Sequence, residues 1–275
     1  MKLTLWHNGL STCSQKVRLA LAESGCNWES CEVNLIAGEQ KDPAYLAIHP
    51  RGLVPALAVD GGILIESSVI NEFIADLAPE LKLRPDGPLG QAHGRLWVRR
   101  IEETVHPAMG AITLATVFRT FMLQRPRDEV LAEIAQVADG NERSARLEIF
   151  ELGAEAPSFR GAVTRLVEFL DDLDRALATS PWICGERFSL VDCAAIPYVD
   201  RLNRLGLDVL WTGQRFHLAR WLAAAKERRA YKVAIENWFP ATTADMIRMI
   251  GEANRPAFLE AAISCSKPVP GVEAS

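Results

Sequence analysis

The feature of this 275-residue sequence that most constrains its fold is the confinement of convincing strand patterns to residues 1–77. Alternating apolar residues predict a strand over 3–6, and a second strand pattern runs from Asn27 to about Leu35. Between them lies an apolar stripe at helical spacing, which Gly25 can close. Because strand–helix–strand units form right-handed crossovers, these two strands are expected to pair in parallel.

A tight hairpin and a helix complete this first region. Two apolar runs flank Asp60-Gly61-Gly62, residues that suit the positive φ angles of a tight hairpin turn. The following helix has a polar start over 66–68. Its apolar residues repeat at helical spacing, at Val69, Ile70, Phe73, Ile74 and Leu77.

The remainder of the chain has helical periodicity only. The stretch 79–90 is rich in proline and glycine and is predicted to be a linker. Helical patterns follow near 91–122, 127–150, 157–179, 190–204 and 215–230. The sequence therefore predicts an α+β domain over 1–78, an all-helical domain over 91–252 and a frayed tail over 253–275.

Composition excludes several classes of function. A formal net charge of -5 gives no electrostatic reason to bind nucleic acid or an anionic membrane. No apolar run approaches the ~20 residues that a membrane-spanning helix needs, and the first ten residues lack the features of a signal peptide. The 6 cysteines have no CxxC spacing, and the histidines add no metal-like cluster. We therefore expect a soluble cytoplasmic protein with reduced thiols and no metal.

Four stretches, taken together and in order, resemble the cytosolic glutathione transferase superfamily. "STCSQKVRLAL" resembles the serine loop and helix of Zeta and Phi class members, and "GEQKDPAYLAIHPRGLVPAL" resembles the Phi-type run into the Val-Pro hairpin. "ESSVINEFI" matches the family's Glu-Ser helix start, and "FSLVDCAAIPY" its Ser-x-x-Asp capping box. The resemblance implies a thioredoxin-like N-terminal domain, a helical C-terminal domain and a homodimer. It also implies a glutathione site near the N-terminal domain and a hydrophobic substrate site at the domain junction.

The resemblance places the catalytic hydroxyl of the family at Ser11. One hydrogen bond from a hydroxyl stabilises a thiolate by roughly 1.5–3 kcal/mol, which is enough to make it the major form near neutral pH. The alternative is that Ser11 or Thr12 only caps the helix, where Thr12 and Gln15 have capping-box spacing. Cys13 is a rival nucleophile, because a cysteine near a helix N-terminus has a depressed pKa. We expect the Ser11 hydroxyl to stabilise the glutathione sulfur, and Thr12 and Ser14 to stabilise the helix.

The resemblance also implies the residues that bind glutathione. The bond between Val54 and Pro55 is cis in the family, and Val54 then pairs with the cysteinyl backbone of glutathione. Glu66 and Ser67, at a helix start, are expected to hold the γ-glutamyl end, with plain helix capping as the alternative. The glycine end is assigned to Gln40 and to Lys41, which is otherwise a solvated lysine. Leu53 departs from the Phi pattern, where a polar residue is usual, so one hydrogen bond to glutathione is missing.

The second substrate is expected to bind along the first long helical segment. The candidates, for which core packing is the alternative, are His106, Met109, Thr113, Val117 and Phe121. The stretches "HPRGLVPAL" and "LKLRPDGPLGQAHGRLWVRRIEE" also resemble bacterial glutathione-dependent β-aryl etherases. Ser189 and Asp192, in contrast, are expected to be purely structural.

Three functions remain open from the sequence. The first is a glutathione transferase that conjugates a small hydrophobic electrophile or cleaves an aryl ether. The second is a thiol transferase or reductase that depends on Cys13. The third is a non-catalytic binding module on the same fold, against which the joint presence of Ser11, Val54, Glu66 and Ser67 argues.

Overall fold

The computed structural model describes residues 1–265, apart from the side chains of residues 264 and 265. Two compact units make up the chain. The first contains Met1–Ile101, Leu173–Arg201 and Phe216–Ala244, and the second contains Glu102–Asp172, Leu202–Arg215 and the chain from Asp245 onward.

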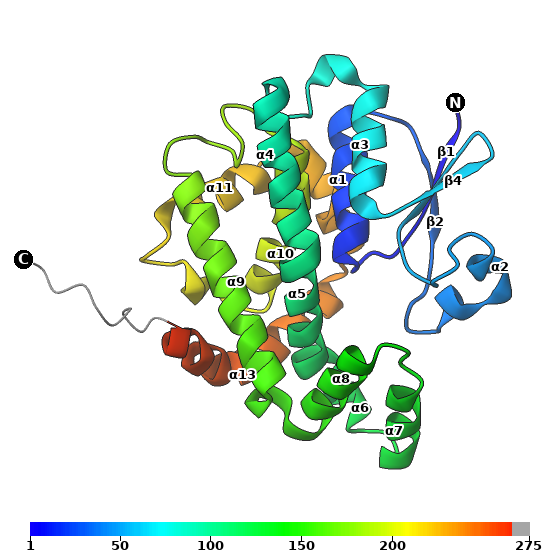
Figure 1. Ribbon diagram of the computed structural model, residues 1–275, viewed down its shortest axis with the longest axis vertical. Helices are drawn as coiled ribbons and strands as arrows, with labels where there is room; N and C mark the ends of the chain where they lie inside the picture. Colours follow the sequence, from blue (N-terminus) through cyan, green and yellow to red (C-terminus); the bar gives the residue numbers. More distant parts are fainter. Residues whose placement is uncertain (266–275) are drawn as a thin grey trace, which may run out of the picture. The chain divides into compact units, whose positions relative to one another are not determined.

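The first unit contains a four-stranded sheet of order β2-β1-β3-β4 (Figure 1). Its strands are β1 (Leu3–His7), β2 (Glu29–Glu32), β3 (Ala56–Val59) and β4 (Gly62–Ile65). β1 pairs with β2 in parallel, and the β3–β4 hairpin joins β1 antiparallel. The strand–helix–strand unit, the hairpin and the α+β fold class are thus confirmed.

Two helices pack against each other in this region, α1 (Thr12–Ser24) and α3 (Ser67–Leu77). α1 ends where expected, because Gly25 has a φ of 66° and closes the helix in the left-handed conformation. The hairpin turn likewise has positive φ at Asp60 (45°) and Gly61 (93°).

Strand β2 is shorter than its sequence pattern predicts. It ends at Glu32, and only the Val33 amide continues toward β1, donating to the His7 carbonyl at 2.7 Å. The side chain of Asn34 then accepts from the amides of Ile36 and Ala37, both at 3.1 Å. This local hydrogen bonding competes with the strand ladder and turns the chain at Asn34.

Short helical segments follow the turn. They are η1 (Glu39–Lys41) and α2 (Pro43–Leu46), and the 3₁₀ turn η2 (Pro79–Leu81) follows α3. The predicted linker over 79–90 is shorter than expected, because α4 (Gly87–Arg100) already begins at Gly87 with a proline in its first turn. Gly94 lets α4 approach closely, since a Cβ there would lie 3.0 Å from Pro85 and 3.1 Å from Val191.

The helices of the second half differ from the predicted segments mainly at their ends. The segment predicted over 127–150 is two helices, α7 (Arg127–Ala135) and α8 (Gly140–Leu152). Asp139 starts the second of them by accepting from the Glu142 amide at 2.7 Å. The other helices are α5 (His106–Thr113), α6 (Arg119–Met122), α9 (Pro157–Ala176), α10 (Leu190–Arg204), α11 (Phe216–Lys226), α12 (Arg229–Ala234) and α13 (Ala241–Cys265), with short 3₁₀ turns at η5 (Gly153–Glu155), η6 (Asp208–Leu210) and η7 (Glu236–Trp238).

The C-terminal segment differs from the expected tail. Helix α13 continues through Pro256 as far as Cys265, so residues 253–265 are helical. A proline removes one hydrogen bond and can be accommodated where packing compensates, and Phe258 is buried against Phe159 with ring centroids 5.0 Å apart. Residues 266–275 lie outside the described part of the chain.

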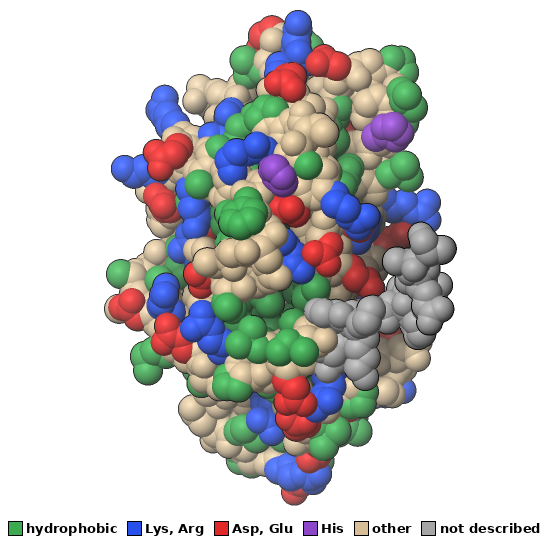
Figure 2. Space-filling view, turned by 90° about the vertical axis from the view of Figure 1, so that its left-hand side faces the viewer, with side chains coloured by type: hydrophobic (Ala, Val, Ile, Leu, Met, Phe, Trp, Pro, Cys, Tyr) green, Lys and Arg blue, Asp and Glu red, His purple; other side chains and the backbone are tan. Residues whose placement is uncertain are grey.

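The surface carries both signs of charge. Figure 2 shows basic and acidic side chains interspersed with hydrophobic ones on the face that it draws. Large apolar side chains are also exposed on α4, where Leu89 and Leu96 are 70% and 64% exposed.

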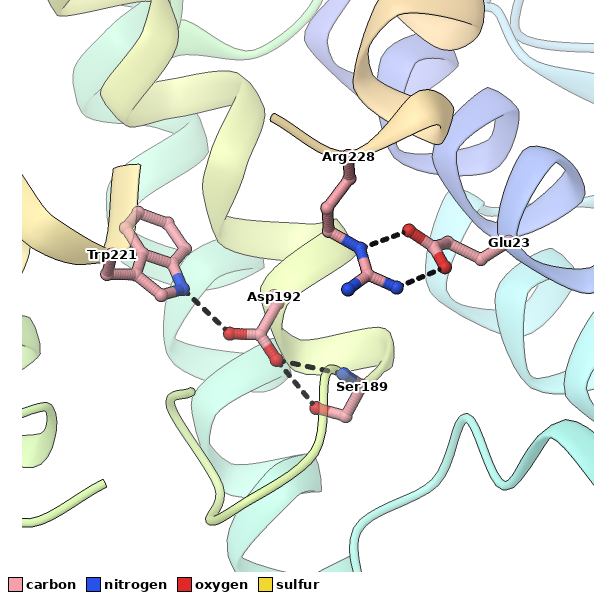
Figure 3. Close-up of polar contacts among 5 residues, drawn as sticks. All are labelled: Glu23, Ser189, Asp192, Trp221 and Arg228. Atoms are coloured by element: carbon pink, nitrogen blue, oxygen red, sulfur yellow. Dashed lines mark hydrogen bonds and ion pairs between the residues drawn. The ribbon is translucent and has the colours of Figure 1, made fainter. Parts of the chain in front are cut away.

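The Ser-x-x-Asp motif anchors the start of α10 (Figure 3). The fully buried Asp192 carboxylate accepts from the Ser189 amide at 2.9 Å, from the Ser189 hydroxyl at 3.1 Å and from the Trp221 indole at 2.8 Å. Nearby, the Nε and Nη2 atoms of Arg228 each donate a hydrogen bond of 2.6 Å to the Glu23 carboxylate of α1. The structural role expected for Ser189 and Asp192 is confirmed.

Candidate functional site

Ser11 lies at the junction of β1 and α1 and is the N-cap of that helix. Its side-chain oxygen accepts from the Ser14 amide at 3.2 Å, with extended backbone angles of -67° and 121°. The assignment of the cap to Thr12 is therefore wrong, since Thr12 is the first helical residue. The Thr12–Gln15 capping box is also absent, because the Gln15 amide group donates to the Gly9 carbonyl at 3.4 Å instead.

The capping hydrogen bond of Ser11 does not involve its hydroxyl proton. A hydroxyl has one proton to donate and two lone pairs, and the cap engages only a lone pair. Among the described residues, the Ser11 hydroxyl donates to no acceptor. Capping and thiolate stabilisation are therefore compatible in this one side chain, and they need not be divided between Ser11 and Thr12.

Cys13 is the second residue of α1, and its side chain is half-buried. It shares the helix N-terminus, where N–H groups favour an anion. Two other cysteines, the half-buried Cys184 and the buried Cys193, have a different electrostatic environment. Burial raises the pKa of Cys184 to about 12 and raises the pKa of Cys193 well above its usual value. Both thiols are therefore neutral and unreactive near neutral pH.

The β1–α1 loop rests on two buried polar residues that the sequence patterns did not indicate. Arg18 donates to the carbonyls of Asn8 (3.0 Å) and Gly9 (2.8 Å), and its Nη1 lies 3.0 Å from Nδ1 of His7. Burial, followed by the positive charge of Arg18, lowers the pKa of His7 to about 3. His7 is therefore neutral and can accept from Arg18 while its other ring nitrogen bonds Ser30 at 2.8 Å.

The Val54–Pro55 peptide bond is cis, which confirms the expected conformation. The Leu53 carbonyl accepts from the Tyr45 hydroxyl at 2.7 Å, and the Leu53 side chain is 49% exposed. In the described part of the chain, neither the N–H nor the C=O of Val54 has a backbone partner. Val54 thus presents one free donor and one free acceptor, which an extended peptide can pair with.

Glu66 and Ser67 lie at the start of α3, and Glu66 has an unusual backbone conformation. Its φ is 70° and its ψ is 114°, outside the regions that most residues populate. The Glu66 carboxylate caps no N–H of α3 and instead forms an ion pair with Arg51. The capping alternative is therefore wrong for Glu66. The buried Ser67 begins a helix whose first N–H groups are free to receive a carboxylate.

Gln40 and Lys41 belong to η1, which lies close to the loop that precedes Val54. Gly52 has a φ of +60°, and a Cβ there would lie only 2.6 Å from the Gln40 carbonyl oxygen. The side-chain oxygen of Gln40 is buried without a hydrogen-bond partner, and its amide nitrogen makes a long bond of 3.5 Å to Leu35. The fold therefore brings Gln40 near residues 52–54, whereas the Lys41 side chain is exposed.

The candidates for the second substrate lie in the second unit, along α5, the π-helical turn η4 (Leu114–Phe118) and α6. Another π-helical turn, η3 (Ile101–Val105), precedes α5. Met109 is buried, in line with core packing, whereas Phe121 is 45% exposed and His106 is also exposed. Thr113 and Val117 are half-buried, and the Thr113 hydroxyl donates to the Met109 carbonyl at 2.8 Å.

The described residues contain neither a metal-binding cluster nor a membrane-spanning helix. Within residues 1–265, no group of three or more His, Cys, Asp or Glu side chains is arranged to hold a metal ion. Over the same residues, each helix is too short or too polar to cross a bilayer.

Two family models match the chain. The model described as the glutathione S-transferase N-terminal domain matches residues 10–77, and the model of the glutathione S-transferase C-terminal domain matches residues 128–224. Together they span more than half of the sequence.

Individual relatives agree with these matches. Glutathione S-transferase TCHQD of Arabidopsis thaliana is 26% identical over 243 residues, which is 86% of this chain and 91% of the relative. Maleylacetoacetate isomerase of Pseudomonas aeruginosa is 41% identical over 117 residues (42% of this chain, 54% of the relative). Protein LigF of Sphingobium is 37% identical over 105 residues (38% of this chain, 41% of the relative).

The solved structure of the β-etherase LigF has the same fold. It superposes with a TM-score of 0.76 at 24% identity, covering 86% of this chain and all of the other. With its four-stranded sheet, its helical second half and two matching domain models, the chain belongs to the glutathione S-transferase family of enzymes.

Proposed function

We propose that this protein uses Ser11 to hold the sulfur of glutathione as a thiolate, which then attacks a small hydrophobic, aromatic electrophile. A free thiol has a pKa near ~8.5, so only about 3% is thiolate at neutral pH. Lowering that pKa by roughly two units needs about 2.7 kcal/mol. A hydroxyl bond to the anion supplies roughly 1.5–3 kcal/mol and a helix N-terminus about 0.3–1 kcal/mol.

The observation that carries the proposal is the state of the Ser11 hydroxyl. It is fixed in place by the Ser14 amide and still has a proton to donate. A donor that is already oriented loses little entropy when the anion forms, which is the property that stabilises developing charge. Cys13 would be the reacting group only in a thiol transferase, and its place at the same helix start keeps that alternative open to test.

The residues around Val54 fit the peptide backbone of glutathione. The free N–H and C=O of Val54 would pair with the cysteinyl residue, and the N–H groups at the start of α3 would receive the γ-glutamyl carboxylate. Glu66 would bind the γ-glutamyl ammonium in exchange for Arg51. Gln40 and Lys41 would bind the glycine end, Gln40 with its unpaired amide oxygen facing an N–H group.

The electrophile is proposed to include β-aryl ethers. Support comes from the partial likeness to Protein LigF, whose solved structure is described as a β-etherase. In such a reaction the thiolate forms a C–S bond at the carbon that carries the aryl oxygen, and that C–O bond breaks. The aryl oxide leaves with the bonding electrons and takes a proton from water. Exposed Phe121 and the half-buried Val117 are proposed to contact the aromatic ring.

A homodimer is part of the proposal. Four large apolar side chains are exposed on elements of the first unit: Ile63 of β4 (42%), Val69 of α3 (52%), Leu89 and Leu96 of α4. They are proposed to form part of the dimer interface, because a patch of exposed apolar side chains marks an interaction surface. We expect sedimentation to report a dimer for the wild type and a folded monomer for the double variant Leu89→Glu, Leu96→Glu. A wild-type protein that sediments as a monomer at micromolar concentration contradicts the assignment.

The test of the chemistry compares Ser11→Ala with Cys13→Ala. Thiolate absorbance of the protein–glutathione complex, titrated against pH, should show an apparent pKa that rises by about one to two units in Ser11→Ala, because roughly 1.5–3 kcal/mol of hydrogen bonding is lost. Cys13→Ala should change it little. Turnover is measured on a β-aryl ether, an aromatic halide and a glutathione mixed disulfide. If Cys13→Ala alone abolishes turnover, and only on the disulfide, the thiol-transferase function replaces this one.

A further inference from the structure

Arg18 is a buried cation that forms no ion pair among the described residues, although the charge of Glu32 acts on it from a distance. Its side chain is 1% exposed, and within the described residues it forms no ion pair with Asp or Glu. Instead it donates to three backbone carbonyls, those of Asn8, Gly9 and Ala234, the last at 2.7 Å. Burying a charge without a counter-ion is costly, so such a residue usually has a role that a neutral side chain would not fill.

A second arginine binds the backbone carbonyl of the residue that follows Gly9. Arg201 of α10 is also buried and donates to the carbonyl of Leu10. The carbonyls of three successive residues, Asn8, Gly9 and Leu10, are thus bound by two guanidinium groups. The next residue in the chain is Ser11.

The turn η7 also lies against this loop. A Cβ on Gly9 would lie 2.8 Å from the Trp238 carbonyl oxygen, so only glycine fits there. The Trp238 ring lies 4.6 Å from the His7 ring (between centroids) and 5.2 Å from the Arg18 guanidinium (Cζ to ring centroid). Trp238 and Arg18 therefore both restrict movement of the loop.

We propose that Arg18, assisted by Arg201, is a positioning residue for the thiolate site: by binding the carbonyls of residues 8–10 it sets where the Ser11 hydroxyl lies. This inference rests on the proposed function. A hydrogen bond weakens steeply when its geometry departs from the usual range, and a site that is about 1 Å too loose loses most of its effect. Arg18 touches no reacting atom in this scheme and acts through Ser11.

The charged and titratable groups that face Arg18 are few. They are His7 from β1, at 3.0 Å, and Glu32 at the end of β2. Burial lowers the pKa of Arg18 to about 9, and the negative charge of Glu32 opposes that shift. Helix α12 and η7 contribute the Ala234 carbonyl and the Trp238 ring. His7 is neutral above about pH 3, and a pKa of about 9 keeps Arg18 protonated near neutral pH.

The experiment uses the full-length protein in four variants: Arg18→Met, Arg18→Lys, Arg201→Met and Arg228→Met. The last is the matched control, because Arg228 also anchors α1, through two hydrogen bonds to Glu23, but within residues 1–265 forms no hydrogen bond or ion pair with residues 8–11. The first readout is the apparent pKa of bound glutathione from thiolate absorbance. The second is hydrogen exchange of the backbone amides over residues 8–14 without glutathione.

Arg18→Met is expected to raise the pKa of the bound thiol by about one unit, which is a tenfold smaller acid dissociation constant, while glutathione affinity changes less than about threefold. Arg201→Met should shift the pKa in the same direction and by less. Amide exchange over 8–14 should accelerate in both variants. Arg228→Met should lower the urea midpoint without affecting either readout.

Two results would overturn the inference. One is an unchanged thiol pKa and unchanged exchange in both Arg18→Met and Arg201→Met. The other is an equal change in Arg228→Met, which would make the effect one of general stability. If Arg18→Met does not fold, Arg18→Lys and Arg201→Met decide by the same criteria. A wild type whose glutathione shows no lowered pKa refutes the proposed function instead, and the exchange readout then still decides whether Arg18 positions the loop.

Discussion

The β1–α1 loop and the helical stretch from His106 to Met122 are proposed to handle the two reactants, and they are held in place by different forces. In the loop, buried polar groups bind the backbone, and His7, Arg18 and Ser14 all have specific partners. The helical stretch is held mainly by apolar packing and exposes Phe118 (51%) and Phe121 (45%). Activation of a thiol requires polar groups at fixed positions, whereas apolar contact with an aromatic substrate tolerates variation.

The largest expected effect is the acid sensitivity of the loop region through His7. The folded-state pKa of His7 is lowered to about 3 from an ordinary value of 6.5, so the folded state favours neutral histidine. The resulting stability is present above pH 6.5 and is lost as the pH falls from 6.5 toward 3, on the order of 5 kcal/mol in total. Urea unfolding at a series of pH values should show this loss in the wild type.

A matched pair of variants isolates this contribution. His7→Asn should remove most of the slope between pH 6.5 and 3, whereas His93→Asn, at an exposed position on α4, should leave it unchanged. Equal slopes in His7→Asn and in the wild type would show that neutral His7 does not hold the loop.

A smaller effect is expected at the start of α3. The double variant Glu66→Ala, Ser67→Ala should raise the glutathione dissociation constant at least tenfold, since two charge-assisted contacts exceed ~1.4 kcal/mol. Calorimetry measures the affinity, and Arg51→Ala serves as the control because it removes only the partner of Glu66. Unchanged affinity in the double variant would contradict the assignment of Glu66 and Ser67 to the γ-glutamyl end of glutathione.

The smallest effect is expected in the helical stretch. Phe121→Ala should raise the KM for an aromatic electrophile by about threefold to tenfold, corresponding to roughly 1 kcal/mol of apolar contact, and leave glutathione affinity unchanged. Phe118→Ala, at a neighbouring exposed ring, is the comparison variant. If both variants change glutathione affinity as much as the electrophile KM, the two reactants are not handled by separate regions.

Several elements show why local patterns predicted the fold better than the site. The hairpin and the Ser189–Asp192 box are set by residues close in sequence, and both were predicted correctly. The cap of α1 was misplaced by one residue, because Ser11 and Thr12 are chemically equivalent as caps and only the backbone path chooses between them. The π-helical turns η3 and η4 shift the helical register on both sides of α5. A sequence pattern that assumes 3.6 residues per turn cannot predict such a shift.

The sequence by itself determined the order of strands and helices in residues 1–77, the helical character of the rest and the motifs that carry the family. These follow from hydrophobic periodicity and turn chemistry, which act over a few residues. Only the tertiary structure decided what holds Ser11, the serine that is proposed to stabilise the thiolate. The Arg18 bond to Ala234 joins residues 216 positions apart, and the Arg201 bond to Leu10 joins residues 191 apart. Such contacts leave no local pattern, because their partners are backbone carbonyls that every residue carries.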